Sequence, residues 1–437
     1  MTSQRTKARW LALSIQSGSW DDAAVTDRLR RALPSGFGEV TRLSARLRLR
    51  FDDSSPPDID ALVAYLLQEP LLTSVFESDA IKGPLLDPPV MTAAPAELLT
   101  FPLPELATWS DVSAWLSLTD KELAWFADCR SQQARVTEKK LHHYNYFWVP
   151  KRSGSLRLIE APKPRLKAIQ RKILHEILNR VPPHPCAHGF SRGRSTKTYA
   201  GQHVGQDAVL RLDLKDFFHS VPVARIGALY RRLGYPKTVA WLLQGLCTNS
   251  TSASLAGKPY QQLPWEQRKR LESKHLAQGA PTSAQLANLC AWRLDCRLEG
   301  LAKQYGLHYT RYADDIALSG AYRLAQMSGF IEALVGSIAI DEGFRLNHRK
   351  TRLRLGSQRQ CLAGIVVNEK PNCRRADWDR LKAILHNCRK FGPKSQNVGA
   401  HSDFKAHLRG RLAYVSWLNP TRAEKLTRLW DEIDWSA

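Results

Sequence analysis

The chain has 437 residues, enough for about two to four domain-sized units, and its 43% hydrophobic content with 13 Trp excludes a disordered protein. No apolar run approaches the roughly 18 residues that a membrane span needs, and the N-terminus lacks the apolar core of a signal peptide, so we expect a soluble, cytoplasmic protein with no membrane partner. The formal net charge of +23 predicts a polyanionic partner, for which nucleic acid is the first candidate.

The charge is unevenly distributed along the chain. Residues 51–125 hold 2 Lys and Arg against 13 Asp and Glu, whereas residues 126–437 hold 52 against 24. We interpret residues 1–125, partly acidic and rich in Pro, as an N-terminal extension of unknown role. The eight Cys include no CxxC pair, which is typical of free thiols in a reducing compartment rather than of a disulfide framework or a zinc site.

The expected elements mix helices and strands without a regular alternation. In the extension we expect a helix over 21–33, a short one over 59–68 and two capped helices within 109–129. A hairpin over 145–164, an amphipathic helix over 166–180 and a buried strand that starts at 208 and breaks by 221 follow. Residues 248–277 are polar and are interpreted as an insertion or a flexible arm.

Five more elements are expected after that segment: a long helix from about Pro281 to Tyr305, a strand–turn–strand over 311–320, a helix over 324–340, a strand over 361–368 and basic helices over 375–437. Because no regular βαβ pattern is present, the order of elements indicates an α+β fold.

Two acidic sites adjoin apolar strands. RYADDIALSG, residues 311–320, places Asp314 beside Asp315 between apolar residues, where burial and like charge both cost free energy. Alone, this pair is typical of a turn. Asp213 ends the apolar run AVLRL, with Asp216 three residues later, and alone it is equally typical of a helix cap. Together, a strand-end Asp and an Asp-Asp hairpin fit two-metal phosphoryl transfer, in which carboxylates hold two ions about 3.5–4 Å apart.

Six segments, in chain order, resemble the motifs of the reverse transcriptase family. They are PKRSGSLRLIEAP (150–162), LDLKDFFHSV (212–221), QGAPTSAQLANL (278–289), YADD (312–315), GFRLNHRKTRL (343–353) and LAGIVVN (362–368). The resemblance covers about residues 140–370. It implies a right-hand polymerase fold, with fingers and an antiparallel-sheet palm over 126–370, an insertion at about 248–277, and a small basic helical thumb over 371–437.

The resemblance also implies roles for individual residues. The catalytic set is Asp213, Asp314, Asp315 and Lys350. The three Asp and the backbone carbonyl of Leu214 are expected to bind two Mg²⁺ ions, or Mn²⁺, with Asp314 contacting both ions and Asp315 supporting the site from one side. Lys350 is expected to protonate pyrophosphate, although by itself it is also typical of a surface charge.

Other residues are implied to bind substrates. Those for the dNTP are Lys151, Arg152, Arg157, Asp216, Phe217, Phe218 and Gln278, and those for template and primer are Gly279, Pro281, Gly364 and Ile365. Phe218 aligns with an aromatic steric gate that leaves no room for a ribose 2′-OH. By themselves, the two Phe are equally typical of a core and the basic hairpin residues of a solvated surface.

Within the family, the chain is most similar to the retron enzymes. These carry Asn-Ala-x-x-His before the first catalytic motif and Val-Thr-Gly at the primer grip. This chain has YAGQH, in which Ala200 and His203 match and Tyr199 departs, and Leu362-Ala363-Gly364, in which the Gly matches. DLKDFF and AHGFSRGRS are also retron-like, and LHHYNYFWVPKRSG is similar to retron enzymes of myxobacteria.

The retron resemblance implies an RNA-directed DNA polymerase that binds its own structured non-coding RNA. It would copy part of that RNA into single-stranded DNA from a guanosine 2′-OH, giving a branched RNA–DNA molecule (msDNA). The implied biological role is anti-phage defence, with an effector protein encoded nearby.

Two alternatives stay open. The departures at Tyr199, Leu362 and Ala363 leave room for another bacterial lineage, defence-associated or group II intron-like, although no His- and Cys-rich endonuclease module follows the polymerase motifs. The other alternative is a non-catalytic RNA-binding protein with a polymerase-like fold, which the presence of all three Asp disfavours.

Overall fold

The computed structural model describes residues 2–18, 20–51, 57–87, 89–93, 95, 99, 101–133, 136, 138–151, 154 and 156–435. Its internal contacts divide the chain into two compact units, Met1–Met91 and Thr92–Ala437. All eight Cys are free.

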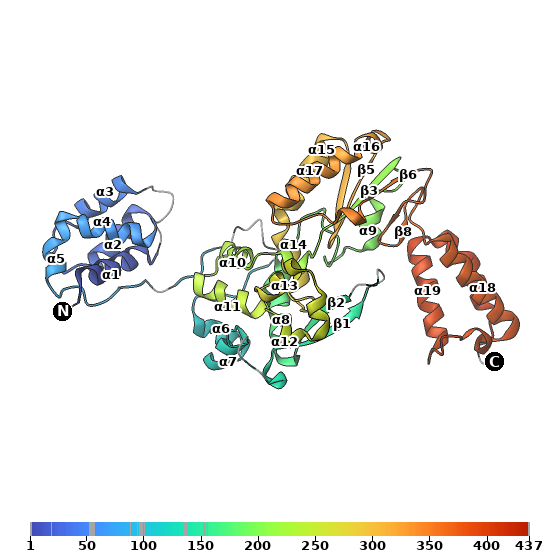
Figure 1. Ribbon diagram of the computed structural model, residues 1–437, viewed down its shortest axis with the longest axis horizontal. Coiled ribbons are helices and arrows are strands. Elements are labelled where there is room, and N and C mark those ends of the chain that lie inside the picture. Colours follow the sequence, from blue (N-terminus) through green and yellow to red (C-terminus); the bar gives the residue numbers. More distant parts are fainter. Residues whose placement is uncertain are drawn as a thin grey trace. The chain divides into compact units, whose positions relative to one another are not determined.

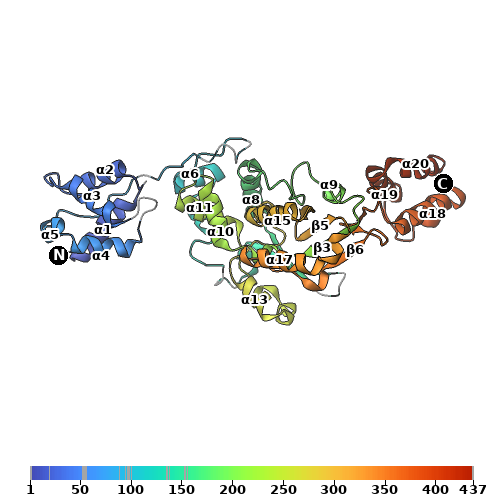
Figure 2. The same ribbon diagram turned by 90° about the horizontal axis from the view of Figure 1, so that it is seen from above.

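The first unit is helical (Figure 2). Its helices are α1 (Gln4–Gln16), α2 (Asp22–Ala32), α3 (Val40–Arg50), α4 (Ile59–Gln68), the 3₁₀ turn η1 (Pro70–Leu72) and α5 (Thr73–Glu77). They enclose a core in which Leu11, Leu29, Leu43 and Leu62 are fully buried. The helices expected over 21–33 and 59–68 are confirmed, whereas α1 and α3 were not expected. In α3 the Leu-Arg alternation, with Leu49 89% exposed, hides the helical spacing of the buried leucines.

In the part of the chain that the structure describes, no single helix is long and apolar enough to cross a membrane. The bent pair Ile59–Gln68 and Pro70–Glu77 meets the criterion by length and composition when taken together, with an angle of 76° between its halves.

The centre of the second unit is a four-stranded antiparallel sheet in the order β4-β5-β3-β6 (Figure 1). Its strands are β3 (Ala208–Asp213), β4 (His308–Tyr312), β5 (Asp315–Gly320) and β6 (Arg352–Leu355). Side chains alternate between the faces of a sheet. Tyr309 and Arg311 of β4 therefore reach Asp295 on one face, and Thr310 between them reaches His203 on the other. The expected α+β class with an antiparallel sheet is confirmed.

Helices α15 (Trp292–Gln304) and α17 (Ser328–Asp341) cover the face that holds Asp295, and α9 (Thr196–Gly201) lies on the opposite face (Figure 1). The long helix expected from Pro281 is interrupted at Ala291, so that α14 (Ser283–Cys290) precedes α15. The helix expected over 324–340 likewise comprises α16 (Arg323–Gln326) and α17. The 3₁₀ turns η5 (Phe218–Ser220) and η7 (His348–Lys350) lie in the segments that follow β3 and precede β6.

A second group of elements surrounds the expected hairpin. It consists of η3 (Lys139–Leu141), the strands β1 (Tyr144–Pro150) and β2 (Leu156–Pro162), α8 (Pro164–Glu176), η4 (Leu178–Arg180), α10 (Val223–Arg232) and α11 (Lys237–Cys247). The hairpin and the helix expected over 166–180 are confirmed.

The two capped helices expected within 109–129 are α6 (Trp109–Leu116) and α7 (Asp120–Phe126), each with a capping box. Both pack on α11, where a Cβ on Gly245 would lie 2.3 Å from the carbonyl oxygen of Ala127. These helices therefore belong to the second compact unit, although the sequence analysis assigned them to the N-terminal extension.

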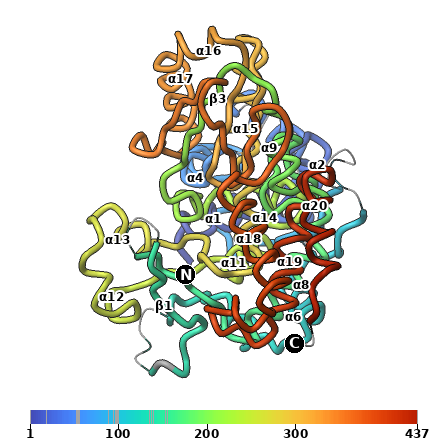
Figure 3. The backbone as a smooth tube through the Cα atoms, turned by 90° about the vertical axis from the view of Figure 1, so that its right-hand side faces the viewer, coloured from blue at the N-terminus to red at the C-terminus, as the bar shows by residue number. Residues whose placement is uncertain are grey.

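Residues 248–277 are folded rather than an extended arm. The segment forms α12 (Ala253–Ala256), η6 (Lys258–Gln262) and α13 (Trp265–Glu272), which lie beside β1 (Figure 3). Tyr260 and Leu271 are buried against Leu158 of β2, and the indole of Trp148 donates to the carbonyl of Ala256 at 2.7 Å. The segment thus packs on the hairpin.

The strand expected over 361–368 is instead a small hairpin of β7 (Cys361–Leu362) and β8 (Ile365–Val366). Ala363 and Gly364 have φ angles of 46° and 88°, and two consecutive residues with positive φ form the tight turn that reverses a chain.

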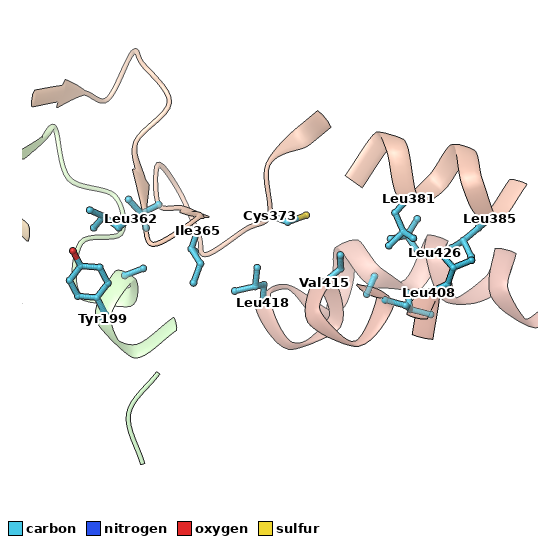
Figure 4. Close-up of a cluster of buried hydrophobic side chains, with 14 of the residues drawn as sticks. Tyr199, Leu362, Ile365, Cys373, Leu381, Leu385, Leu408, Val415, Leu418 and Leu426 are labelled. Carbon is cyan, nitrogen blue, oxygen red and sulfur yellow. The ribbon is translucent and has the colours of Figure 1, made fainter. Parts of the chain in front are cut away.

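The C-terminal segment is helical, as expected. Its elements are α18 (Arg375–Phe391), η8 (Pro393–Gln396), α19 (Phe404–Leu418) and α20 (Pro420–Asp431). One hydrophobic cluster joins these helices to β7, β8 and α9. Figure 4 shows it running from Tyr199 through Ile365 to Leu418 and Leu385. The burial of these side chains anchors the C-terminal helices to the body of the unit.

Candidate active site

Pairing between β3 and β5 brings the predicted acids together. Asp213 is the register partner of Asp315, and Asp314 lies in the two-residue turn that joins β4 to β5. The backbone N–H of Leu214 donates to the carbonyl of Asp314 at 2.8 Å, which ties the end of β3 to this turn. Three carboxylates from two chain segments thus meet at one edge of the sheet.

Two of the three carboxylates have cationic partners. Lys350 Nζ lies 2.9 and 2.8 Å from the two oxygens of Asp213, and Asn347 Nδ2 donates to one of them at 3.2 Å. Arg211 donates to both oxygens of Asp315, with Nη2 at 2.6 and 2.9 Å. Lys350 and Asp315 are therefore placed at the site, as the sequence predicts.

Asp314 forms no ion pair with any residue that the structure describes. Burial raises the pKa of Asp314 to about 6, and the negative charges of Asp315 and Asp213 add to the shift. A buried carboxylate next to two others favours a bound cation, and oxygen ligands of this kind suit Mg²⁺ and Mn²⁺. The donor set therefore fits the divalent ions that the sequence predicts.

A buried network holds the turn that carries Asp314. Arg311, fully buried, forms an ion pair with Asp295 of α15 at 2.6 Å, and its Nη1 donates to the carbonyl of Ala313 and to Asn288 of α14, both at 3.0 Å. From another side, the backbone of Gly189 lies so close that an added Cβ would stand 2.5 Å from the Ala313 nitrogen. The turn is thus fixed by its neighbours, and Ala313 keeps a φ of 56°.

Comparisons with known proteins agree with this geometry. Residues 149–378 match the family model described as reverse transcriptase (RNA-dependent DNA polymerase). The Retron Mx65 reverse transcriptase of Myxococcus xanthus is 42% identical over 335 residues, which cover 76% of this chain and 73% of that protein. The chain belongs to the retron reverse transcriptases. It is an RNA-directed DNA polymerase.

Further relatives support this assignment. The Retron Mx162 reverse transcriptase of Myxococcus xanthus is 33% identical over 77% of this chain and 69% of its own. The Retron Ec86 reverse transcriptase of Escherichia coli is 29% identical over 62% and 75%. Among solved structures, a telomerase chain from Candida albicans is 11% identical over 70% of this chain and 59% of its own, with a TM-score of 0.36, a likeness too weak to bear on the site.

The two Phe residues of this reverse transcriptase differ in environment. Phe217 is buried, stacks on Phe344 at a centroid distance of 5.6 Å and belongs to the core. Phe218 is half-buried, and its ring lies 6.2 Å from that of Phe190, which is 54% exposed. The Phe190 ring in turn lies 6.3 Å from that of Tyr312, the last residue of β4. Of the two, Phe218 has the accessible ring that a steric gate needs.

The other residues predicted to bind the nucleotide are spread over three elements. Lys151 and Arg157 are exposed on the β1–β2 hairpin, and Arg152 lies outside the described residues. Asp216, with a φ of 51°, is approached by Gln267 and by Arg270 of α13. The structure therefore brings the insertion to this side chain.

Gln278 and the two residues predicted for the template lie next to β2. The carbonyl of Gln278 accepts the backbone N–H of Glu160 at 2.9 Å. Gly279 has a φ of 132°, and an added Cβ would lie 3.0 Å from the Glu160 carbonyl. The backbone of Gly279 therefore lies directly against β2. Pro281 is half-buried just before α14.

The retron-like element and the predicted primer grip are mainly structural. His203, fully buried, lies 2.7 Å from both Ser319 Oγ of β5 and Thr310 Oγ1 of β4. Tyr199 packs 5.7 Å from the ring of Tyr312, and Ala200 is buried beside it. At the primer grip, Gly364 is in the β7–β8 turn, while the Ile365 side chain is fully buried in the cluster of Figure 4 and offers only its backbone to a ligand.

Several residues that hold the site were not predicted from the sequence. They are Arg211, Asn347, Arg311, Asp295, Asn288 and Phe190. Arg211 places a charge inside the apolar run AVLRL two residues before Asp213, and that anomaly is the signal that could have found it. Arg311 lies in HYTRY, whose mixed composition gives no such signal.

We predict that His203 makes stability depend on pH. Burial lowers the pKa of His203 to about 3, so the unfolded chain takes up its proton first as the pH falls. The contribution of neutral His203 to the unfolding free energy is fully present above pH 6.5 and declines as the pH falls toward 3. Between pH 6.5 and 5.5, wild type should lose about 1 kcal/mol more unfolding free energy than His203→Gln in urea titrations. Parallel losses in the two proteins would contradict this prediction.

Proposed function

We propose that this enzyme binds a cognate structured non-coding RNA and copies part of it into single-stranded DNA, giving a branched RNA–DNA product. It would act in the cytoplasm in anti-phage defence, with an effector protein encoded nearby. The proposal is supported by the retron enzymes among its relatives and by the retron-like residues Ala200, His203 and Gly364.

The convergence of Asp213, Asp314 and Asp315 carries the chemical part of the proposal. Two Mg²⁺ ions held there would lower the pKa of the attacking hydroxyl and stabilise the charge of the leaving pyrophosphate. Asp213, Asp314 and the Leu214 carbonyl are the proposed ligands. Both oxygens of Asp315 accept hydrogen bonds from Arg211. In this proposal Asp315 orients the start of β5 and adds negative charge to one side of the metal site.

The basic C-terminal helices support RNA binding. Residues 345–437 hold 20 Lys and Arg against 8 Asp and Glu. A cavity of about 600 Å³ lies between α18 and α19, beside Gly364 of the predicted primer grip. Its polar and aromatic lining consists of Arg374, His407, Arg411 and Tyr414 together with one acid, Asp377. Cationic and aromatic side chains at this position suit phosphate and sugar contacts to a structured RNA or its primer end.

Purification of the full chain from cells that encode its cognate RNA tests the proposal. Wild type should retain a nucleic acid that is sensitive to both RNase and DNase. Asp314→Asn combined with Asp315→Asn should retain the RNase-sensitive part and lose the DNase-sensitive part, because synthesis needs both acids whereas RNA binding does not.

The matched control is Asp341→Asn, which changes a carboxylate that is 54% exposed on α17 and should leave both parts in place. DNA synthesis by the double variant at the wild-type level would overturn the active site. Recovery of wild type without any RNA would overturn the cognate-RNA proposal separately.

Lys350 offers a second test, because its ammonium group occupies the Asp213 carboxylate that a metal would use. The Lys350 side chain is 58% exposed whereas that of Asp213 is 7% exposed, and we take this half-buried ion pair to be worth about 1 kcal/mol. Lys350→Met should therefore lower the Mg²⁺ concentration for half-maximal synthesis by about two- to fivefold. If Lys350 also protonates pyrophosphate, the maximal rate should fall at the same time. Lys303→Met, exposed on α15, is the control. An increased Mg²⁺ requirement would show that Lys350 orients Asp213 instead.

Phe218 and Phe217 form a matched pair for testing sugar selection. Phe218→Ala should raise incorporation of ribonucleotides relative to deoxynucleotides by about tenfold or more, because the ring no longer excludes the 2′-OH. Phe217→Ala should lower thermal stability through a core cavity and leave that ratio near the wild-type value. Competition assays with each dNTP and rNTP measure the ratio. If Phe218→Ala incorporates ribonucleotides and deoxynucleotides in the wild-type ratio, Phe218 is not the steric gate.

A further inference from the structure

A second cluster of metal-ligating side chains lies outside the catalytic acids. It contains Glu160 of β2, His219 of η5 and His275, which follows α13, and one ligand atom from each lies within 4.8 Å of the others. His275 Nε2 is 3.0 Å from Glu160 Oε2, and His219 Nε2 is 3.7 Å from the same oxygen. Glu160 and His275 are fully buried, and the His219 side chain is 16% exposed.

Neighbouring groups orient two of the three side chains, Glu160 and His275, as in a metal site. The Glu160 carboxylate accepts from Thr251 Oγ1 at 2.6 Å and from Asn249 Nδ2 at 2.9 Å. His275 Nδ1 lies 2.8 Å from the carbonyl oxygen of Ser273, and since a carbonyl only accepts, this nitrogen carries the proton. Metal-binding His residues characteristically donate their second N–H in this way.

If the imidazoles of His219 and His275 are both neutral, no positive charge lies among the ligand atoms that face one another in the cluster. With its proton on Nδ1, a neutral His275 presents the Nε2 lone pair to a carboxylate, which repels it. His219 Nε2 is buried and has no hydrogen-bond partner among the described residues. Two lone pairs and a carboxylate therefore face one another, an arrangement that a cation would stabilise.

We propose that Glu160, His219 and His275 bind a transition-metal ion, with Zn²⁺ the best match. Two imidazoles and one carboxylate suit Zn²⁺, and Zn–N bonds of about 2.0–2.1 Å place tetrahedral ligands about 3.3 Å apart. The two imidazole–carboxylate distances, 3.0 and 3.7 Å, lie on either side of this value, and the two imidazole nitrogens lie within 4.8 Å of each other. The fourth position would take water. No oxygen of Asp213, Asp314 or Asp315 belongs to this cluster.

Such an ion would have a structural role. It would join the β1–β2 hairpin to the segment that carries Asp213 and Phe218, and to the end of the 248–277 insertion. Gln278 is attached to the same point, because its backbone pairs with that of Glu160. Three segments that contribute predicted substrate contacts would therefore keep a fixed mutual position.

The competing explanation is a charged His275 without metal. Burial lowers the pKa of His275 and the Glu160 carboxylate raises it, with a net upward shift, so an imidazolium–carboxylate pair would also neutralise Glu160. That explanation gives His219 Nε2 no partner. The metal content of the purified protein distinguishes the metal site from the ion pair.

The test is elemental analysis of the untagged full chain, purified without chelators and dialysed. Wild type should hold about one Zn²⁺ per chain, and His219→Gln and His275→Gln should each lose most of it. His175→Gln, exposed on α8, and Asp314→Asn should keep it. Another first-row ion at the same stoichiometry, lost in the same two variants, would support the site.

If a variant folds poorly, titration of the metal-free protein with ZnCl₂, followed by its thermal stability, still tests the proposal. Metal-free wild type should gain thermal stability on addition of ZnCl₂, and His219→Gln, which loses no existing hydrogen bond of this nitrogen, should gain none. Metal-free wild type that shows no thermal shift would overturn the proposal in favour of the ion pair. Equal Zn²⁺ content in wild type and both His variants would overturn it as well.

Discussion

The pairing of β3 with β5 is the constraint on which the rest of the second unit depends. It sets Asp213 opposite Asp315, and like charges directly across an antiparallel pair destabilise a sheet. Counter-charges lie close by: Arg211, two residues before Asp213 on the same face of β3, binds Asp315, and Lys350 binds Asp213. Asp314 alone is left without an ionic partner among the described residues, so the local electrostatics favour a cation at this one position.

The turn that presents Asp314 needs support from both faces of the sheet. On one face, Arg311 is buried without exposure, and such a charge is tolerated only when its donors are satisfied. Asp295, Asn288 and the Ala313 carbonyl satisfy them, which ties the turn to α14 and α15. On the other face, His203 bridges β4 and β5. The retron-like His therefore contacts the two strands that flank Asp314 and not Asp314 itself.

The structure brings Asp213, Asp314 and Asp315 to the same end of the sheet, and their catalytic role stays a prediction. The sequence predicts these acids because they are local features: charges beside apolar strands, in an order that resembles a known family. It predicts the α+β class and most helices for the same reason. It does not predict Arg211 as the partner of Asp315, because that pair depends on strand register between residues 104 positions apart. The β7–β8 hairpin was not predicted because its turn needs a positive φ at Ala363, and alanine rarely adopts one. Helix α3 was missed because alternating Leu and Arg imitate a strand.

The polar composition of 248–277 indicated a flexible arm, whereas the segment is folded and packs on the hairpin. A polar segment is expected to be solvated, yet here its two ends contribute side chains to a buried polar centre on Glu160: Asn249 and Thr251 from the first, and His275 from the second. Buried polar groups are stable only when their hydrogen bonds are made, and those bonds fix geometry more narrowly than apolar contacts do. A segment that holds β2 through this centre and approaches Asp216 through Arg270 is therefore suited to set the distance between the hairpin and the catalytic strand. The polar side chains of 248–277 supply the hydrogen bonds that an element positioned between two segments predicted to bind substrate requires.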